Sequence, residues 1–426
     1  MKVPIQLNPL YGLARRVTEI GPDDVAFDGL RVLQHPERFR KFLMGQELDI
    51  VPVTVQMWPS LSCDVRCPTC PYRLTDARDE ADRDAALHLM PFDLFKRLVC
   101  SLKEAGVKAV FLTGGGEPLL HPEIASMACE LQSIGLSWGL FTNGISLTAE
   151  IGEKLLRAAP GVFRVSLDAG TPDLYSKIYA TDPQMFSVVK ANIVTVGTIA
   201  AQLDYNWFGV GFAVMPNTST ADICEMRDTF IGLVEQTNMG VNFASFRPRV
   251  VHHHKKEVVV PQRWSGQYRD LAQRIRDHVV EPINEAYKGL VRIDHKYGAF
   301  TDCDRDVSPK GGWGGSWIAT LDHSASGSIV SHMTGASNNP TAWGSALNGG
   351  NFLGAWDSDR RRAAQQLVID GVVRLPVANG FRAIDAFLEK VKDTFPEKLS
   401  EETVDALMDG IEGWDFHRSS RPMFVG

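Results

Sequence analysis

Short apolar segments alternate with helix-like segments between residues 51 and 247, and this alternation limits the folds open to the chain. The six apolar segments are rich in β-branched and aromatic residues and cover residues 51–57, 107–113, 136–142, 161–167, 207–215 and 240–246. The segments between them have the spacing of amphipathic helices. Strands that alternate with helices in this way pair in parallel, with right-handed crossovers. The sequence therefore predicts an α/β fold with one parallel sheet.

The chain is long enough for one large domain with smaller additions. It has 426 residues, of which 44% are hydrophobic and 22% are charged. Its composition changes near residue 301, where a Gly-rich segment precedes a predicted hairpin at 316–334 and a helical tail. We therefore expect an N-terminal extension over residues 1–50, an α/β core over 51–300 and a small α+β unit over 301–426.

The charge and the apolar runs limit the partners that we expect. The formal net charge of −7 gives no general attraction to nucleic acid or to an anionic membrane surface. No apolar run approaches the roughly 20 residues that span a bilayer, and the first residues lack the apolar core of a signal peptide. The sequence therefore predicts a cytoplasmic protein with no nucleic-acid or membrane partner.

Three cysteines, Cys63, Cys67 and Cys70, directly follow the first predicted strand, and no fourth follows closely. In a reducing compartment such a cluster indicates metal binding or redox chemistry. A structural zinc ion needs four protein ligands, and no further Cys or His lies at zinc spacing here. A 4Fe–4S cluster also has four corners, which thiolates usually fill. Three thiolates predict such a cluster with one iron left open for a small bidentate ligand.

The spacing Cys-x-x-x-Cys-x-x-Cys after the first strand of an alternating α/β chain resembles the radical S-adenosylmethionine (SAM) superfamily. The resemblance covers about residues 51–300 and implies a partial (βα)6 TIM-like barrel. It implies that the amino and carboxylate groups of SAM chelate the open iron. Reduction by an external donor of the flavodoxin or ferredoxin type would then cleave SAM and yield a 5′-deoxyadenosyl radical.

Other residues match motifs of this superfamily. Gly115, Gly116 and Glu117, in "TGGGEP", match the Gly-Gly-Glu motif that binds the SAM amino group. Glycines let the backbone approach a ligand closely, and a carboxylate offsets an ammonium. The position before the third cysteine is usually aromatic in the family, but here it is Thr69. We expect Tyr72 to take over part of the adenine contact.

Further candidates lie near the carboxyl ends of later strands, where such sheets place their chemistry. The resemblance implies cofactor or substrate contacts for Asn143, Ser166, Asp168, Lys177 and Arg247. A helix cap, a turn or a surface charge is the alternative for the first four. Three cysteines in helix patterns, Cys100, Cys129 and Cys224, are expected in the core.

The C-terminal unit resembles the auxiliary domain called SPASM or twitch, which carries extra clusters in many members of the superfamily. Here Ser331 and His332 occupy the expected cysteine positions, and Cys303 alone remains near the unit. The resemblance therefore implies a domain that has lost its cluster and covers the barrel mouth. Such a cover would exclude water from a reactive radical.

The nearest branch by layout is the amino-sugar deaminase and aminoglycoside diol dehydratase branch of antibiotic biosynthesis. That resemblance implies hydrogen abstraction from an amino-sugar substrate and loss of water, with Asp168, Asp294 and His295 as acid or base candidates by position alone. Dehydrogenation is an alternative, as is epimerisation with Cys303 as hydrogen donor. Modification of a ribosomal peptide is a further alternative.

Overall fold

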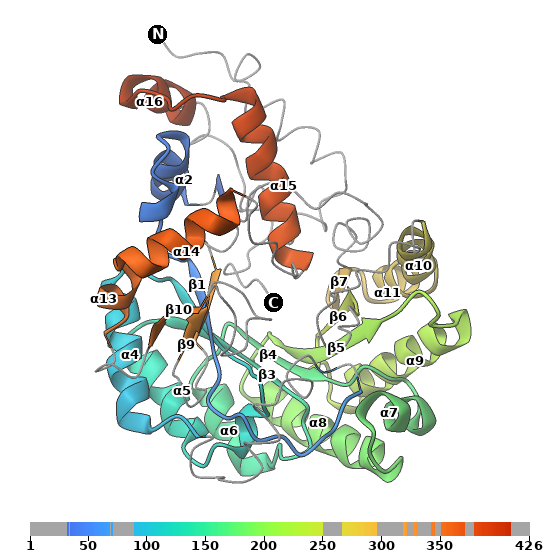
Figure 1. Cartoon of the computed structure of the whole chain (residues 1–426). Coiled ribbons are helices and arrows are strands. Elements are labelled where there is room, and N and C mark those ends of the chain that lie inside the picture. Colours follow the sequence, from blue (N-terminus) through green and yellow to red (C-terminus); the bar gives the residue numbers. More distant parts are fainter. Residues whose placement is uncertain are drawn as a thin grey trace.

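The computed structural model describes residues 32–33, 35–68, 70, 89–249, 266–295, 318–321, 328–330, 342–345, 351–370 and 379–409. The strands in these ranges form a single sheet in the order β10-β9-β8-β1-β2-β3-β4-β5-β6-β7. The sheet curves around the centre of the molecule, and helices lie along its outside (Figure 1).

Seven consecutive strands of the sheet run in parallel. They are β1 (Thr54–Met57), β2 (Ala109–Leu112), β3 (Ser137–Thr142), β4 (Val162–Ser166), β5 (Phe208–Val214), β6 (Phe243–Pro248) and β7 (Arg292–His295). The first six confirm the predicted strands and the predicted α/β class. The seventh, β7, was missed because its alternating pattern is short, with only Val291 and Ile293 as apolar residues that alternate with Arg292 and Asp294.

The outer helices begin and end close to the predicted positions. They are α4 (Phe92–Glu104), α5 (Ile124–Ser133), α6 (Ala149–Arg157), α7 (Pro172–Tyr179), α8 (Gln184–Gln202), α9 (Thr220–Gln236), α10 (Gln267–Ile275), a π-helical segment (Arg276–Val280) and α11 (Glu281–Tyr287). Side-chain oxygens of Thr148, Thr171 and Ser219 accept hydrogen bonds from the first turns of α6, α7 and α9. These N-caps satisfy backbone donors that have no partner inside the helix.

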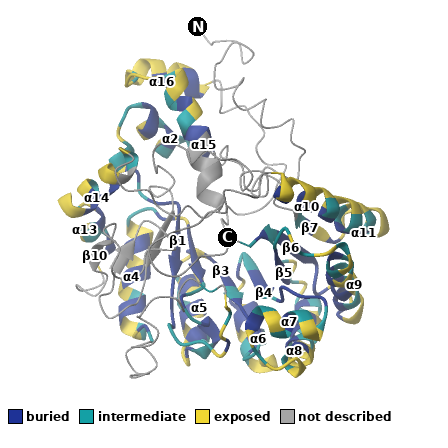
Figure 2. Cartoon of the chain, turned by 45° about the vertical axis from the view of Figure 1, so that its right-hand side comes forward, coloured by how far each residue is buried: buried dark blue, intermediate teal, exposed yellow. Residues whose placement is uncertain are grey.

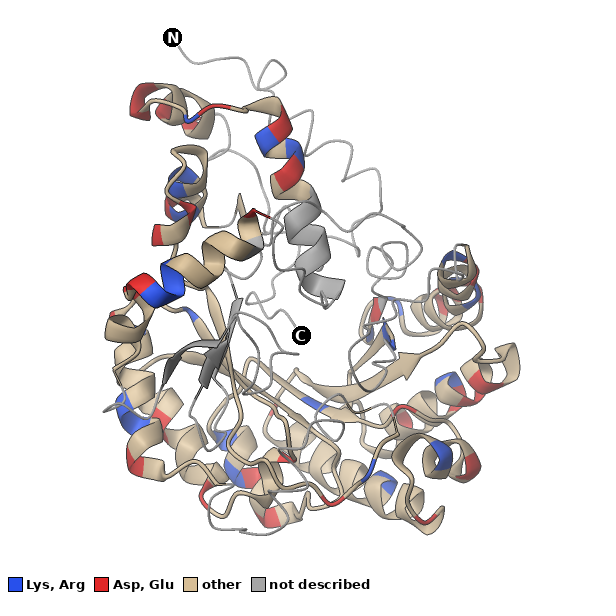
Figure 3. Ribbon diagram, viewed as in Figure 1, with Lys and Arg blue, Asp and Glu red and all other residues tan. Residues whose placement is uncertain are grey.

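The main core lies between the outer face of the sheet and these helices (Figure 2). Along β4, Phe163 and Val165 belong to this core, whereas Arg164 and Ser166 alternate with them on the face toward the barrel interior. Acidic and basic side chains are interspersed over the outer helices (Figure 3). The sheet therefore has an apolar face toward the helices and a more polar face toward the interior.

None of the three helical cysteines belongs to this core. Cys100 on α4 and Cys129 on α5 are exposed, and Cys224 on α9 is half-buried. The expectation of a core position is wrong. For the first two the reason is that their preceding neighbours, Val99 and Ala128, occupy the buried positions of the helical repeat.

One helix, α8, is long and apolar enough to cross a membrane by length and composition. In the structure it packs against α6, α7 and α9 on the outside of the sheet. A helix that covers a sheet in a folded domain can be equally long and apolar. The packing of α8 against its neighbours therefore explains its composition.

The predicted hairpin extends the same sheet. Strand β8 (Ile318–Leu321) pairs in parallel with β1. Strand β9 (Ser328–Val330) pairs antiparallel with β8, and β10 (Ala342–Ser345) pairs antiparallel with β9. Helices α13 (Phe352–Trp356) and α14 (Asp359–Ile369) follow. The boundary near residue 301 stays a prediction.

A second, smaller core brings together residues near 32–53 and residues near 387–408. It is formed by α2 (Pro36–Leu43), α15 (Asn379–Thr394) and α16 (Glu401–Asp409), together with Ile50 and Val53 from the segment before β1. The rings of Phe39 and Phe387 lie 6.2 Å apart. These elements lie together at the top of the view in Figure 1. No sequence pattern had indicated that residues so far apart pack together.

Candidate active site

The three clustered cysteines lie on the loop after β1, at the carboxyl edge of the sheet. All three are free thiols and partly exposed, and the Cys70 backbone N–H donates to the Cys67 carbonyl at 3.1 Å. Burial, followed by the nearby Cys70, raises the pKa of the Cys67 thiol to about 12. A positively charged metal centre would favour thiolates at this loop.

The loop suits a cluster of several irons better than a single ion. Within the described ranges, no three His, Cys, Asp or Glu side chains come close enough together to hold one metal ion. A 4Fe–4S cluster binds each thiolate to a separate iron, so its ligands do not share the tight shell of a zinc ion. The residues are therefore compatible with the predicted cluster, and the assignment of Cys63, Cys67 and Cys70 as its ligands stays a prediction.

The glycine-rich turn after β2 packs directly against the cysteine loop. The Glu117 backbone N–H donates to the Ser62 carbonyl at 2.7 Å. A Cβ atom at Gly116 would lie 2.3 Å from that carbonyl oxygen, and one at Gly115 would lie 3.0 Å from the Trp58 ring. Gly116 is therefore required for the close approach of two backbone segments.

We expect Gly116→Ala to destabilise the fold by about 2 kcal/mol, because its methyl group meets backbone that cannot turn away. The cysteine loop should shift, so the iron content after anaerobic reconstitution should fall as well. The control is Gly232→Ala on α9, where the nearest atom to a new Cβ is 3.6 Å away. Denaturant unfolding and iron analysis check both variants, and a Gly116→Ala protein as stable as wild type would contradict the expectation.

Glu117 is buried, and protein donors take most of its acceptor capacity. Its Oε1 accepts hydrogen bonds from Leu119 N at 3.0 Å and Thr142 Oγ1 at 2.5 Å, and its Oε2 accepts one from Asn143 N at 2.8 Å. Burial raises the pKa of this carboxyl to about 7. Since each oxygen has two lone pairs, Oε2 retains one acceptor position for the predicted SAM ammonium. The contacts in place show that Glu117 ties the turn after β2 to the end of β3.

Asn143 also connects β3 to the cysteine loop. Its Nδ2 donates to Asp64 Oδ1 at 2.5 Å, and its Oδ1 accepts from Ile145 N at 2.9 Å. Ser146 Oγ donates to Asp64 Oδ2 at 3.3 Å. Sequence reasoning missed Asp64, although its position between Cys63 and Cys67 was a signal. The predicted cofactor contact of Asn143 stays a prediction.

Asp168 follows β4 and connects the end of this strand to β5. It has a φ of 55°, which is uncommon for a residue other than glycine, and it is 5% exposed. Its Oδ1 accepts from Ala213 N at 2.7 Å, and its Oδ2 accepts from Tyr179 Oη at 3.0 Å. The same tyrosine hydroxyl lies 2.5 Å from the Ser166 carbonyl. These contacts indicate a positioning role, while the acid–base role of Asp168 and the cofactor contact of Ser166 stay predictions.

The remaining acid–base candidates lie on β7. Asp294 is half-buried, and Ser245 Oγ donates to its Oδ2 at 3.4 Å from the adjacent strand β6. His295 ends β7 opposite Phe246, and its side chain lies outside the described residues. The predictions for Tyr72, Thr69, Cys303, Ser331 and His332 also fall outside them.

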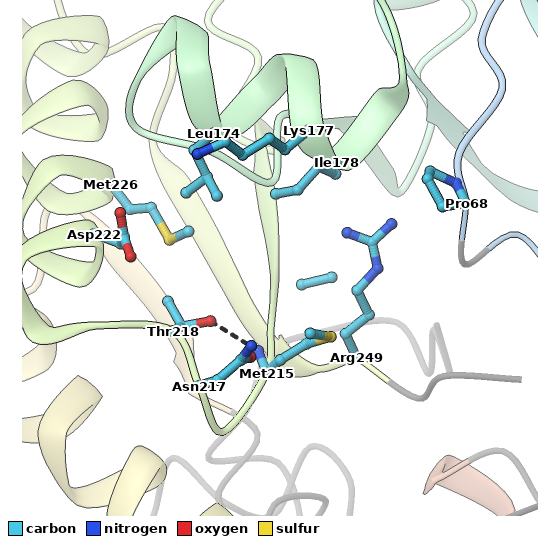
Figure 4. A pocket seen from close by; sticks show the side chains of 11 residues that line it. Pro68, Leu174, Lys177, Ile178, Met215, Asn217, Thr218, Asp222, Met226 and Arg249 are labelled. Atoms are coloured by element: carbon cyan, nitrogen blue, oxygen red, sulfur yellow. Dashed lines mark hydrogen bonds between the residues drawn. The ribbon is translucent and has the colours of Figure 1, made fainter.

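A cavity of about 260 Å³ opens beside the cysteine loop. It lies between α7, the ends of β5 and β6 and the start of α9, and its wall includes Pro68, Lys177, Met215, Met226 and Arg249. Figure 4 shows Lys177 on one side of this space and Arg249 on the other. Because Pro68 lies between Cys67 and Cys70, a small molecule here would sit next to the cluster ligands. Lys177 was predicted, whereas the other four wall residues were not.

Residues 59–194 match the family model described as the radical SAM superfamily. This range holds the cysteine loop and the Gly-Gly-Glu turn, so the chain contains a radical SAM domain. Domains of this kind use a 4Fe–4S cluster and SAM. The predicted superfamily and cofactors are confirmed.

Two curated relatives match parts of the chain. The dTDP-4-amino-4,6-dideoxy-D-glucose ammonia-lyase of Streptomyces venezuelae is 29% identical over 114 residues, which cover 27% of this chain and 22% of the relative. The tungsten-containing aldehyde ferredoxin oxidoreductase cofactor-modifying protein of Pyrococcus furiosus is 28% identical over 107 residues, or 25% of this chain and 28% of the relative. The matched parts therefore span about a quarter of the length of these relatives.

The fold also resembles that of a solved protein. The crystal structure of Streptococcus suis SuiB bound to the precursor peptide SuiA aligns with a TM-score of 0.52 and 15% identity, over 79% of this chain and 71% of that one. At this identity the similarity concerns the fold alone.

Proposed function

We propose that this radical SAM enzyme removes a hydrogen atom from an amino-sugar substrate of the aminoglycoside type and eliminates water from it, as a step in antibiotic biosynthesis. The observation that carries the proposal is the polar interior of the barrel, where Ser245 and Asp294 meet on β6 and β7 and Arg247 lies 4.0 Å from Asp168. A substrate with many hydroxyl groups needs donors and acceptors of this kind. An external flavodoxin or ferredoxin would supply two electrons per turnover. One cleaves SAM, and the other, together with a proton, reduces the sugar radical that remains after water is lost.

Asp294 is the best-placed group for the elimination. A sugar radical beside a hydroxyl loses water when one group accepts the proton of the retained hydroxyl and another protonates the leaving one. Asp294 is half-buried and hydrogen-bonded to Ser245, which would orient its carboxylate. Asp168 is less suited, because its side chain is more deeply buried than that of Asp294 and is held by Ala213 N and Tyr179 Oη.

One relative supports the substrate class. The Streptomyces venezuelae protein is named as a lyase that acts on an amino sugar, and it is similar to this chain over 114 residues. An elimination of water from a related sugar would be redox-neutral, so it would need no second cluster in the C-terminal unit. We also expect the enzyme to be cytoplasmic, where reduced electron carriers are available.

The test is anaerobic incubation of the reconstituted enzyme with SAM, a reductant and candidate amino sugars, followed by mass spectrometry. We expect loss of water from the sugar together with formation of 5′-deoxyadenosine. Loss of two hydrogens would identify a dehydrogenase instead. Unchanged mass with one deuterium from solvent, abolished by Cys303→Ala, would identify an epimerase, and turnover of a peptide alone would reject the sugar proposal.

We expect Asp294→Asn to lower the rate of water loss about 100- to 10,000-fold, because the variant cannot accept or donate the proton. SAM binding and the iron content should be unchanged, since Asp294 lies on β7, away from the cysteine loop after β1. The matched control is Asp277→Asn, an exposed residue of the π-helical segment. Full activity of Asp294→Asn would remove this residue from the mechanism.

A further inference from the structure

Arg164 and Arg247 lie close together inside the barrel. Each has a buried side-chain nitrogen that donates no hydrogen bond within the described part of the chain. Arg164 on β4 is 6% exposed, and its Nε is buried. Arg247 on β6 has a side chain that is 25% exposed, with its Nη1 buried. Neither atom has a hydrogen-bond partner in the part of the chain that the structure describes. Only Arg247 was a candidate from the sequence.

Gly211 on the intervening strand β5 brings the two guanidinium groups together. A Cβ atom built on this glycine would lie 3.1 Å from Arg164 Nε and 3.1 Å from Arg247 Nη1. In the register of the sheet, Gly211 is aligned with Ser166 on one side and Ser245 on the other. Both cations therefore face the same space over β5, and any larger residue at position 211 would enter it.

The neighbouring groups accept only some of the hydrogen bonds that these two guanidinium groups can donate. The Phe141 ring lies 3.8 Å from Arg164 Cζ and covers one face of the guanidinium, which leaves the donors at its edge available. The Asp168 carboxylate is 4.0 Å from Arg247 and already accepts from Ala213 N and Tyr179 Oη. Burying a cation next to another without acceptors for its donors is costly, so a further group with acceptor oxygens is expected here.

We infer that Arg164 and Arg247 bind an oxyanion, a phosphate or carboxylate, carried by the substrate. A planar guanidinium presents parallel donors that match the oxygens of such a group. The inference rests on the proposed function and narrows it: the amino sugar carries an acidic group, such as a phosphate ester. A free aminoglycoside has several ammonium groups, which the two cations would repel, so the proposed aminoglycoside-type substrate would be a phosphorylated or carboxylated one.

The test compares two probes that differ in one charge-bearing group, an amino sugar 1-phosphate and the methyl glycoside of the same amino sugar. Binding is measured by calorimetry on the reconstituted enzyme with SAM present. We expect the phosphate to bind about 10- to 100-fold more tightly, the range for charge-assisted hydrogen bonds. Arg164→Met and Arg247→Met should each lose most of this preference, and Arg164→Lys should retain a part of it.

The matched control is Arg157→Met, which removes an exposed arginine paired with Glu153 on α6 and should keep the full preference. Circular dichroism and iron content show which variants fold. If Arg164→Met does not fold, the more exposed Arg247→Met and the charge-conserving Arg164→Lys still decide the result.

Each outcome has a defined meaning. Equal binding of the two probes by the wild-type enzyme overturns the inference, even if the methyl glycoside is dehydrated and the proposed function holds. Loss of SAM affinity in the arginine variants with an unchanged phosphate preference also overturns it, because the oxyanion would then be the SAM carboxylate. Arginine-dependent phosphate binding without water loss from any amino sugar supports the inference and rejects the proposed function.

Discussion

The variant with Cys63, Cys67 and Cys70 all changed to alanine is expected to lose its iron and all cleavage of SAM. The wild-type protein should bind roughly four irons and as many sulfides per chain, because we expect these three thiolates to hold a single 4Fe–4S cluster. The half-buried loop offers the cluster no other cysteine among the described residues, because Cys100, Cys129 and Cys224 lie on outer helices. Iron and sulfide analysis after anaerobic reconstitution gives the measurement.

The control for this result is the double variant Cys100→Ala, Cys129→Ala. Both thiols are exposed on α4 and α5, so their removal should leave the iron content and SAM cleavage unchanged. Iron retained by the triple variant would reject the ligand assignment. About eight irons per wild-type chain would mean a second cluster and would reject the expected loss of clusters from the C-terminal unit.

Glu117→Ala is expected to lower the free energy of unfolding by about 3 kcal/mol, because it leaves three buried donors without an acceptor. These donors are the Thr142 hydroxyl and the backbone N–H groups of Leu119 and Asn143. SAM affinity should fall too, since the turn that packs on the cysteine loop loses its tie to β3. Denaturant unfolding and equilibrium SAM binding are the measurements. The control is Glu150→Ala, an exposed residue of α6, and equal stability of the two variants would contradict the role of Glu117.

The pH dependence of stability tests the same residue. The pKa of Glu117 is raised by burial from 4.5 to about 7, so the folded protein keeps this proton where the unfolded chain has released it. The fold therefore becomes less stable as the pH rises from 4.5 to 7, by about 3 kcal/mol for this group. In Glu117→Gln this contribution is absent. The difference in unfolding free energy between wild type and variant should thus fall between pH 5 and pH 8, and a constant difference would contradict the raised pKa.

Asp64, Asn143 and Glu117 show why the site could be predicted only in part. The sequence placed Glu117 and Asn143 at the ends of neighbouring strands and assigned both to the cofactor. In the structure their nearest partners are each other and the cysteine loop: Asn143 N donates to Glu117, and Asn143 Nδ2 donates to Asp64. A motif fixes which residues stand at an edge of the sheet. It does not determine which of their polar atoms already form hydrogen bonds within the protein.

By itself the sequence determined the order and type of the main elements and the three-cysteine loop, because alternation, helical spacing and cap residues act over a few neighbouring positions. Only the tertiary structure decided which distant segments meet. It aligned Gly211 between β4 and β6, so that Arg164 and Arg247 face one space, and it packed α2 against α15 and α16. It also added β7, a strand of four residues that pairs with β6 and whose alternating pattern is too short to predict it. Such contacts depend on register and packing between residues far apart in the chain, which local patterns do not encode.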